Sequence, residues 1–324
     1  MTAENEVILV TGAAGFIGFH LSKRLLDMGY QVVGIDNLNP YYDVRLKEAR
    51  LNRLNPYASF KFYRADLQDL KTLKDIFNAR PVHRICNLAA QAGVRHSLKD
   101  PFSYEQTNLA GFLNILEMAR EHNVKNLVYA SSSSVYGKNK KTPYAVEDRV
   151  DTPISLYAAT KKANELMAHA YSHLFQIPCT GLRYFTVYGP WGRPDMALFL
   201  FTDAMLNGRP IHVYNNGNMR RDFTYIDDIV DGTVAAIERP VPYEIFNLGN
   251  SQSTGLLDFI GMIEAELGIT AQKQLMPMQP GDVAETTADI EASKAALGFS
   301  PKMPLREGIR NFLSWYKRFY EIGD

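Results

Sequence analysis

Residues 7–21 read VILVTGAAGFIGFHL, and this stretch decides the fold of the chain. A run of β-favouring residues ends in three spaced glycines, Gly12, Gly15 and Gly18, and an apolar pattern of helical spacing follows at once. A turn of this kind lets the backbone approach an anion without a Cβ clash, and the N–H groups and positive dipole end of the following helix face that anion. The pattern therefore predicts a dinucleotide-binding turn, with tight strand-to-helix packing as the structural alternative.

A second predicted strand, QVVGID, ends in Asp36, 21 residues after Gly15. A carboxylate at this place can accept hydrogen bonds from both hydroxyls of an adenosine ribose, and it would repel a 2′-phosphate. The sequence therefore favours NAD over NADP as the cofactor.

The composition excludes several classes of protein. The chain has 324 residues with 35 acidic and 35 basic side chains, so bulk charge predicts no nucleic-acid or membrane partner. No apolar run approaches the ~18 residues of a membrane span, and the start, MTAENE, is acidic, so we expect a cytoplasmic protein. Cys86 and Cys179 lie in apolar, strand-like runs, which favours buried reduced thiols over a disulfide or a metal pair.

Strands and helices alternate through the first half of the chain. We expect strands near 6–11, 31–36, 60–66, 84–90, 125–133 and 178–186, and helices near 16–28, 70–80, 102–122 and 155–175. This order predicts an α/β fold with a Rossmann-type doubly wound parallel sheet in residues 1–186. Frequent Gly and Pro after residue 189 predict a smaller α/β domain for substrate over 187–324, with a segment near 223–250 as a candidate to return to the first sheet.

Tyr157 and Lys161 lie four residues apart in a helical pattern, which places phenol and ammonium on one face. A tyrosine beside a fixed cation can act as a general base if its pKa falls by roughly 3 units from about 10. Their helix follows the strand NLVYASSSS, whose serines reach the carboxyl edge of the sheet, where α/β proteins bind ligands. The spacing alone is weak evidence, because it recurs in two pairs, Tyr57 with Lys61 and Tyr136 with Lys140.

These motifs give the chain a clear resemblance. It resembles the extended short-chain dehydrogenase/reductases, and among them the NAD-dependent nucleotide-sugar epimerases, most closely those that act on UDP-glucuronate. The resemblance covers nearly the whole chain and is carried by TGAAGFIGFHL, NLAAQAGVRHS, SSSSVYG, YAATK, RYFTVYGPWGRPDMA, RRDFTYIDDIV and QPGDV.

The resemblance implies a set of residues that bind NAD: Gly12, Gly15, Phe16, Ile17, Gly18, Asp36, Asn37, Asp66, Leu67, Ala89, Ala90, Gln91, Asn108, Tyr157, Lys161 and Tyr184. It implies that Ser132 accompanies Tyr157 and Lys161 in catalysis. For each serine of this run, a turn or N-cap role is the structural alternative.

A further set would bind the nucleotide sugar: Arg95, Ser133, Ser134, Thr186, Arg193, Tyr214, Arg221 and Asp282. Related dehydratases carry Asp-Glu, and related decarboxylases carry Glu, just before the Val-Tyr-Gly that follows Ser134, so this chain lacks the carboxyl group for elimination. Arg193 is the candidate for a bidentate pair with a sugar carboxylate, with Thr186 and the two serines beside it. A solvent-facing loop arginine and, for Tyr214, plain strand packing are the alternatives. Gln279 stands where galactose-type 4-epimerases have Arg, so Arg221 would carry more of the pyrophosphate contact.

The implied reaction is the interconversion of UDP-glucuronate and UDP-galacturonate at C4 through a transient 4-keto sugar, with NAD regenerated in each turnover. The alternatives are 4-epimerisation of another UDP-sugar, such as UDP-glucose or UDP-xylose, and a noncatalytic NAD-sensing regulator. The superfamily also suggests a homodimer joined by the helices 102–122 and 155–175.

Two further features carry less weight. His169 and His173 lack a third ligand, so we expect no metal site. Residues 41–50, YYDVRLKEAR, predict a charged surface helix that could border the cofactor cleft.

Overall fold

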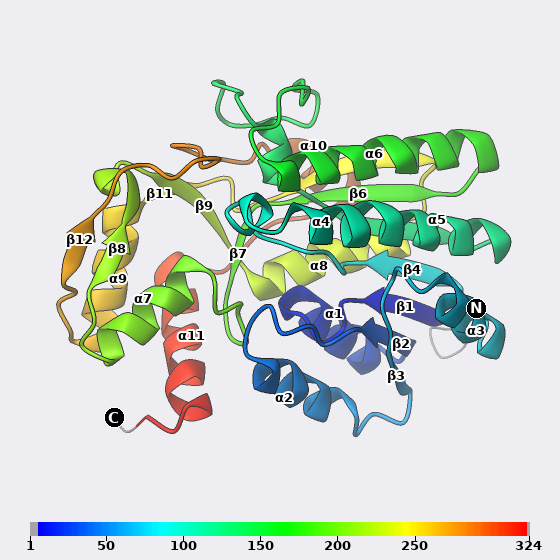
Figure 1. Ribbon diagram of the computed structural model, residues 1–324, viewed down its shortest axis with the longest axis horizontal. Helices are drawn as coiled ribbons and strands as arrows, with labels where there is room; N and C mark the ends of the chain where they lie inside the picture. The colour runs from blue at the N-terminus through cyan, green and yellow to red at the C-terminus, as the bar shows by residue number, and fades with distance from the viewer. Residues whose placement is uncertain (1–5, 323–324) are drawn as a thin grey trace.

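A computed structural model describes residues 6–322 and shows a parallel sheet flanked by helices, with a smaller lobe at one end (Figure 1). Within the described residues the main sheet has seven strands in the order β10-β6-β5-β4-β1-β2-β3. Six of them follow the doubly wound order, which reverses between β1 and β4 and confirms the predicted fold. The strands are β1 (Val7–Thr11), β2 (Gln31–Asp36), β3 (Phe60–Arg64), β4 (Arg84–Asn87), β5 (Asn126–Ser132), β6 (Cys179–Tyr184) and β10 (Tyr243–Leu248).

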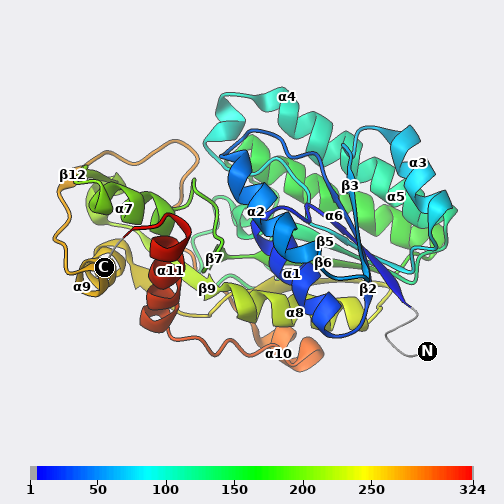
Figure 2. The same cartoon turned by 90° about the horizontal axis from the view of Figure 1, so that it is seen from below.

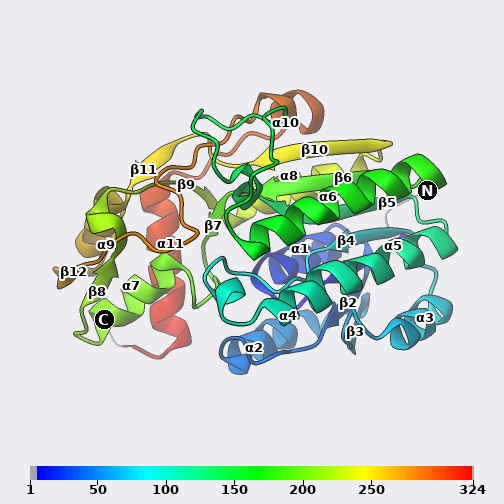
Figure 3. The same cartoon turned by 45° about the horizontal axis from the view of Figure 1, so that its top comes forward.

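Helices cover both faces of this sheet, so its central strands are buried on both sides. One face carries α3 (Leu70–Ala79), α4 (Pro101–Tyr104), α5 (Gly111–Glu121) and α6 (Leu156–Phe175), which lie in front in Figure 3. The other face carries α1 (Phe16–Asp27), α2 (Val44–Leu54) and α8 (Ile226–Glu238), which come forward in Figure 2. The apolar core is correspondingly divided into two clusters, one on each face.

The smaller lobe is built from short elements. They are β7 (Thr186–Tyr188), α7 (Ala197–Leu206), β8 (Ile211–Val213), β9 (Arg220–Tyr225), β11 (Ser253–Gly255), α9 (Leu256–Leu267), β12 (Lys273–Leu275) and α11 (Leu305–Phe319). α10 (Glu291–Leu297) instead packs against β10 and α8 of the large domain (Figure 2). β11, β9 and β7 form one sheet, and β12 pairs with β8. α8 and β10 lie between these elements in sequence but are part of the large domain. β10 pairs in parallel with β6 of the large sheet, and α8 packs on one face of that sheet.

Several predicted elements have different bounds in the structure, and three of these differences matter for the site. The strand predicted over 84–90 ends at Asn87, and the strand predicted over 178–186 ends at Tyr184, after which β7 pairs with β9 of the smaller lobe. The helix predicted over 102–122 is confirmed as a continuous helical segment over 101–121, but it is not α-helical throughout. α4 is followed by a π-helical stretch, Glu105–Ala110, before α5 begins, and such stretches are frequent at functional sites.

The prediction of a charged surface helix over 41–50 was confirmed only in part. α2 does begin at Val44, but Arg50 is completely buried and Lys47 is nearly so. Their charged ends reach inward to polar groups of the cofactor side, which helical periodicity could not reveal.

Cys86 and Cys179 are buried free thiols, as predicted. In the part of the chain that the structure describes, no helix has the length and apolarity to cross a membrane, and no three candidate ligands lie close enough together to hold a metal ion. His169 instead packs edge-on against Tyr243.

Candidate active site

The glycine turn joins β1 to α1 in a very compact form. Gly12 has a φ of +69°, which favours glycine, and its carbonyl accepts from the N–H of Gly15 at 2.8 Å. A Cβ on Gly18 would lie 2.0 Å from the Gly12 oxygen, so α1 can approach the turn only because this residue has no side chain. The first turn of α1 thus presents its N–H groups at the carboxyl edge of the sheet.

Asp36 ends β2 beside this turn and is buried. Its carboxylate accepts from the N–H groups of Ala14 at 3.2 Å and Leu38 at 2.8 Å, and Lys47 Nζ lies 3.8 Å away. Next to it, the Asn37 amide donates to Asp66 at 2.9 Å, so three predicted adenosine-binding residues are brought together.

The segment after β4 is fixed by hydrogen bonds from two sides. Thr11 Oγ accepts from the N–H groups of Leu88 at 3.1 Å and Ala89 at 3.0 Å. The buried Asn108, in the π-helical stretch, accepts from the Gln91 N–H at 2.8 Å and donates back to the Gln91 carbonyl at 3.0 Å. Hydrogen bonds from both sides therefore fix residues 89–91, which are predicted to contact the middle part of the cofactor.

Tyr157 and Lys161 lie on the first turns of α6, close to the end of β5. The Lys161 ammonium lies 6.0 Å from the centre of the Tyr157 ring and donates to the Ala130 carbonyl at 3.0 Å. Ser132 is the last residue of β5, and its hydroxyl accepts from the Ser134 N–H at 3.1 Å, so it also caps the following turn. The predicted catalytic residues are thus gathered at one place on the sheet edge.

The protein alone does not yet make Tyr157 a base. Burial raises the pKa of Tyr157, against the lowering effects of the Ser132 hydroxyl and the Arg193 charge. Burial lowers the pKa of Lys161 to about 8. A role for Tyr157 as a general base would therefore require additional positive charge to lower its pKa, such as the charge that an oxidised nicotinamide carries.

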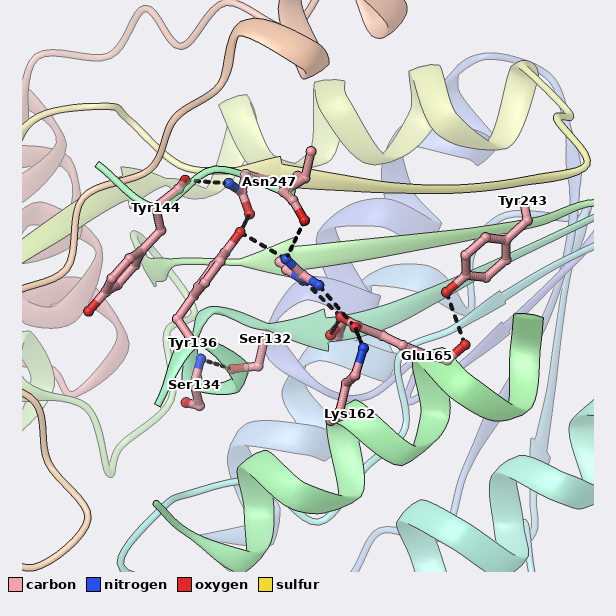
Figure 4. A network of polar contacts seen from close by, with 11 residues as sticks. Ser132, Ser134, Tyr136, Tyr144, Lys162, Glu165, Tyr243 and Asn247 are labelled. Atoms are coloured by element: carbon pink, nitrogen blue, oxygen red, sulfur yellow. Dashed lines mark hydrogen bonds and ion pairs between the residues drawn. The ribbon is translucent and has the colours of Figure 1, made fainter. Parts of the chain in front are cut away.

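A buried polar network holds β5 against α6 behind these residues (Figure 4). Glu165, one turn beyond Lys161, binds Arg183 through two hydrogen bonds of 2.8 and 3.0 Å, and both side chains are almost fully buried. Arg183 donates to the Tyr136 hydroxyl at 3.0 Å, and Tyr136 donates to Asn247 of β10 at 2.7 Å. The network therefore fixes the turn that carries Ser132, Ser133 and Ser134 relative to the helix that carries Tyr157.

Arg193 lies beside this centre but is already paired. Its Nε donates to Asp195 Oδ1 at 3.0 Å and its Nη2 to Oδ2 at 2.5 Å. Its charge lowers the pKa of Tyr157 against the effect of burial, which is consistent with a position near the phenol. Its side chain is 25% exposed, which argues against the alternative of a solvent-facing loop arginine.

Four other predicted substrate residues form a second group, at the smaller lobe. Arg95 donates to Asp282 at 2.9 Å, and its guanidinium lies 4.3 Å from the centre of the Tyr214 ring. Tyr214 begins a short 3-10 turn after β8, so it is not a strand residue. Burial lowers the pKa of Arg221, against the raising effect of Asp282, and Arg221 donates to the Ala284 carbonyl at 3.2 Å.

The remaining predicted residues lie less directly at the site. Tyr184 is paired with Ser132 across β5 and β6, but its hydroxyl is 3.0 Å from Thr233 in the core. Phe16 and Leu67 are buried, whereas Ile17 and Ala90 are half-buried. Thr186 begins β7 on the side of the smaller lobe.

Sequence reasoning missed several residues of this region. Tyr104 is fully buried, packs edge-on against Tyr157 and donates to the carbonyls of Ala92 and Gly93. Asp195 is another missed residue, and its position two residues after Arg193 in GRPDMA could have indicated the pairing. Glu165 and Arg183 left no local signal, because their pairing depends on contact between β6 and α6.

The residues present fit a dinucleotide. The turn at Gly12 leaves no room for side chains, since a Cβ there would lie 3.0 Å from the Ala89 nitrogen, and Asp36 lies one strand away as a ribose acceptor. Together with the supported 88–91 segment, these groups line the carboxyl edge from β2 to β4, the place where this fold binds such cofactors.

Comparison with known proteins agrees with this geometry. The chain is 46% identical over 331 residues to a probable UDP-glucuronate 4-epimerase of Rhizobium meliloti, covering 96% of this chain and 97% of the relative. It is 44% identical over 337 residues to UDP-glucuronate 4-epimerase 4 of Arabidopsis thaliana, covering 98% and 77%.

A solved structure of UDP-glucuronic acid 4-epimerase from Bacillus cereus, in complex with UDP-glucuronic acid and NAD, superposes with a TM-score of 0.90 at 37% identity, covering 97% of this chain and 100% of that one. The family model for NAD dependent epimerases and dehydratases matches residues 8–249, about three quarters of the chain. The chain belongs to the NAD dependent epimerase/dehydratase family.

Proposed function

We propose that the protein is an NAD-dependent isomerase that interconverts UDP-glucuronate and UDP-galacturonate at C4 through a transient 4-keto sugar. The observation that carries the proposal is the convergence of Tyr157, Lys161 and Ser132 on the sheet edge, beside the half-buried Arg193 that pairs with the Asp195 carboxylate. Relatives that share 44 to 46% identity with the chain are named for this activity.

Bound NAD would supply reversible oxidation of the sugar at C4. Tyr157 would take the proton of the 4-hydroxyl group and return it when the ketone is reduced from its other face. Lys161 would hold positive charge near the Tyr157 phenolate. The Ser132 hydroxyl would donate a hydrogen bond to the phenolate oxygen and to the oxygen at C4 of the sugar. The glycine turn and Asp36 would hold the pyrophosphate and the adenosine ribose.

The substrate carboxylate needs its own partners, because a ketone at C4 makes the sugar a β-keto acid that can lose CO₂. Loss of CO₂ requires the bond to C6 to align with the carbonyl π system, so donors that fix the carboxylate also prevent the loss. Asp195 uses Nε and Nη2 of Arg193, and a substrate carboxylate would therefore bind at Nη1. Ser133, Ser134 and Thr186 would add hydroxyl donors.

The second group would bind the UDP half of the substrate. The Tyr214 ring would pack on uracil, and Arg95 and Arg221 would neutralise the pyrophosphate, with Asp282 orienting Arg95. We also propose that residues 187–324, apart from α8, β10 and α10, form the substrate domain, since their sheets are separate from the large one.

Conversion of the sugars tests the function. Purified protein is incubated with UDP-glucuronate, UDP-glucose and UDP-xylose in parallel, and the products are identified by NMR. Formation of UDP-galacturonate from UDP-glucuronate, lost in Tyr157→Phe, is the expected result. Turnover of UDP-glucose or UDP-xylose in preference to UDP-glucuronate would replace the proposed substrate. No turnover of any of them would favour the noncatalytic regulator.

A homodimer is the assembly that we propose. Phe102 of α4, Leu113 of α5 and Leu166 of α6 are 74, 41 and 61% exposed, and these helices cover the same face of the sheet (Figure 3). Exposed apolar side chains on neighbouring helices are typical of an interface. Sedimentation velocity should show a dimer that Leu166→Glu separates, and a monomeric parent protein would contradict the proposal.

We further propose a cytoplasmic location. Two buried thiols that remain unpaired suit a reducing compartment, and cell fractionation followed by immunoblotting would test it.

A further inference from the structure

Arg50 is a buried cation whose role the proposed reaction leaves unexplained. Its side chain is 0% exposed, and the guanidinium reaches from α2 to two loops. Nη1 donates to the Ala14 carbonyl of the glycine turn at 2.8 Å and to the Tyr42 hydroxyl at 2.7 Å. Nη2 donates to the carbonyls of Trp191 at 2.6 Å and Gly192 at 3.3 Å.

None of these partners carries a negative charge, and Nε has no hydrogen-bond partner within the described residues. A buried guanidinium in such surroundings is costly, since neutral carbonyl groups compensate only part of the lost hydration. Arg50 therefore does not stabilise the fold in the way that a buried ion pair can.

The backbone that Arg50 holds is itself unusual. Trp191 has a φ of +61°, a conformation that costs free energy for a bulky residue and persists only where its surroundings impose it. The Trp191 ring packs against Phe19 and Trp315, and the Arg50 donors hold its carbonyl. Two residues later the chain reaches Arg193, so the direction of this guanidinium depends on the strained turn.

A second contact from the same segment holds the other end of this loop. The Tyr41 hydroxyl donates to Asp195 Oδ2 at 3.1 Å, and Asp195 holds Arg193. Tyr41 and Arg50 thus attach the loop that carries Arg193 to residues beside the adenosine ribose site, although the loop follows β7 of the smaller lobe.

We propose that Arg50 is a positioning residue that aims Arg193 at the substrate carboxylate by clamping the Trp191–Gly192 backbone to the glycine turn of the cofactor site. This inference rests on the proposed function and deepens it. The Arg50 guanidinium thus contacts both the loop that carries Arg193, at Trp191, and the glycine turn that would hold NAD, at the Ala14 carbonyl. Selectivity for a uronic acid over a neutral sugar then depends on Arg50, which acts through Arg193 and not by binding the sugar itself.

The test measures binding rather than turnover. Titration calorimetry on the NAD-loaded protein gives the affinities for UDP-glucuronate and UDP-glucose, which differ in charge at C6. We expect Arg50→Lys to weaken UDP-glucuronate binding about tenfold or more and to leave UDP-glucose within about twofold, because one ammonium cannot hold both loops and a small misplacement of Arg193 costs affinity. Arg45→Lys is the matched control, since that side chain is 83% exposed on the same helix.

A double variant separates positioning from general damage. In an Arg193→Ala background, Arg50→Lys should leave the remaining ratio of the two affinities unchanged, because Arg50 acts through Arg193. Equal weakening of both sugars by Arg50→Lys in the parent protein would overturn the inference, and so would an unchanged UDP-glucuronate affinity.

Should Arg50→Lys fail to fold, Tyr41→Phe removes the second contact of the loop and is judged by the same ratio. A selective loss of UDP-glucuronate affinity supports the inference, and no selective loss overturns it. The proposed function is decided separately, by conversion of UDP-glucuronate by the parent protein, so the two failures remain distinguishable.

Discussion

Replacement of Arg183 by Met tests the network that supports α6, the helix that carries Tyr157 and Lys161. Arg183 and Glu165 are 2 and 1% exposed, and two hydrogen bonds of 2.8 and 3.0 Å join them (Figure 4). The variant would leave Glu165 with the Ser131 hydroxyl at 2.7 Å and Lys162 at 3.3 Å. Loss of one partner from a buried pair costs about 3–5 kcal/mol, a large part of the roughly 5–15 kcal/mol that stabilises a typical protein.

The pH dependence identifies the cause of this loss. In the parent protein burial raises the pKa of Glu165, but Arg183 lowers it further, so the pKa lies below its usual range. This pair therefore stabilises the parent fully above the unfolded pKa of about 4.3, and the stabilisation is lost as the pH falls below it. In Arg183→Met burial should dominate and raise the pKa of Glu165, so the variant recovers stability as the pH falls and the carboxyl group takes up a proton.

Urea unfolding followed by circular dichroism at pH 8 and pH 5 measures both effects. The difference in unfolding free energy between parent and variant should narrow at pH 5. Arg149→Met is the control, because Arg149 is 90% exposed in its pair with Asp151 and its loss should be too small to resolve. The combined Glu165→Gln and Arg183→Met variant should be more stable than Arg183→Met alone. A loss below about 1 kcal/mol, or one that does not depend on pH, would refute the reasoning.

Three further predictions concern the site, and a fourth concerns the stability of the fold. Tyr157→Phe should abolish interconversion and retain NAD and UDP-sugar, because the phenol only transfers a proton; activity within about tenfold of the parent would remove this role. Asp36 should make the protein bind NAD more tightly than NADP, and equal affinities by calorimetry would contradict it. Arg193→Ala should lose roughly 2–5 kcal/mol of binding or transition-state stabilisation with UDP-glucuronate and little with UDP-glucose, and mass spectrometry should detect a decarboxylated 4-keto pentose. Burial lowers the pKa of His20 from 6.5 to about 4, so the parent should lose stability as the pH falls through this range. The urea concentration at the midpoint of unfolding should change less with pH in His20→Gln than in the parent.

The sequence alone determined the parts of the protein that depend on neighbours along the chain. The turn at Gly12, Gly15 and Gly18 and the helical spacing of Tyr157 and Lys161 are local, because backbone sterics and helix geometry act over a few residues. Alternation of strands and helices also predicted the doubly wound sheet, and with it the placing of Asp36 at the carboxyl edge.

Only the tertiary structure decided how the charged side chains are used. Arg50 resembled a solvent-exposed residue in a charged helix, yet it is buried against two loops more than 30 and 140 residues away in sequence. Glu165 meets Arg183, and Arg193 reaches the region of Tyr157, through packing of separate elements. The cost of burying a charge depends on the groups that surround it in space, and no local pattern of residues specifies those groups.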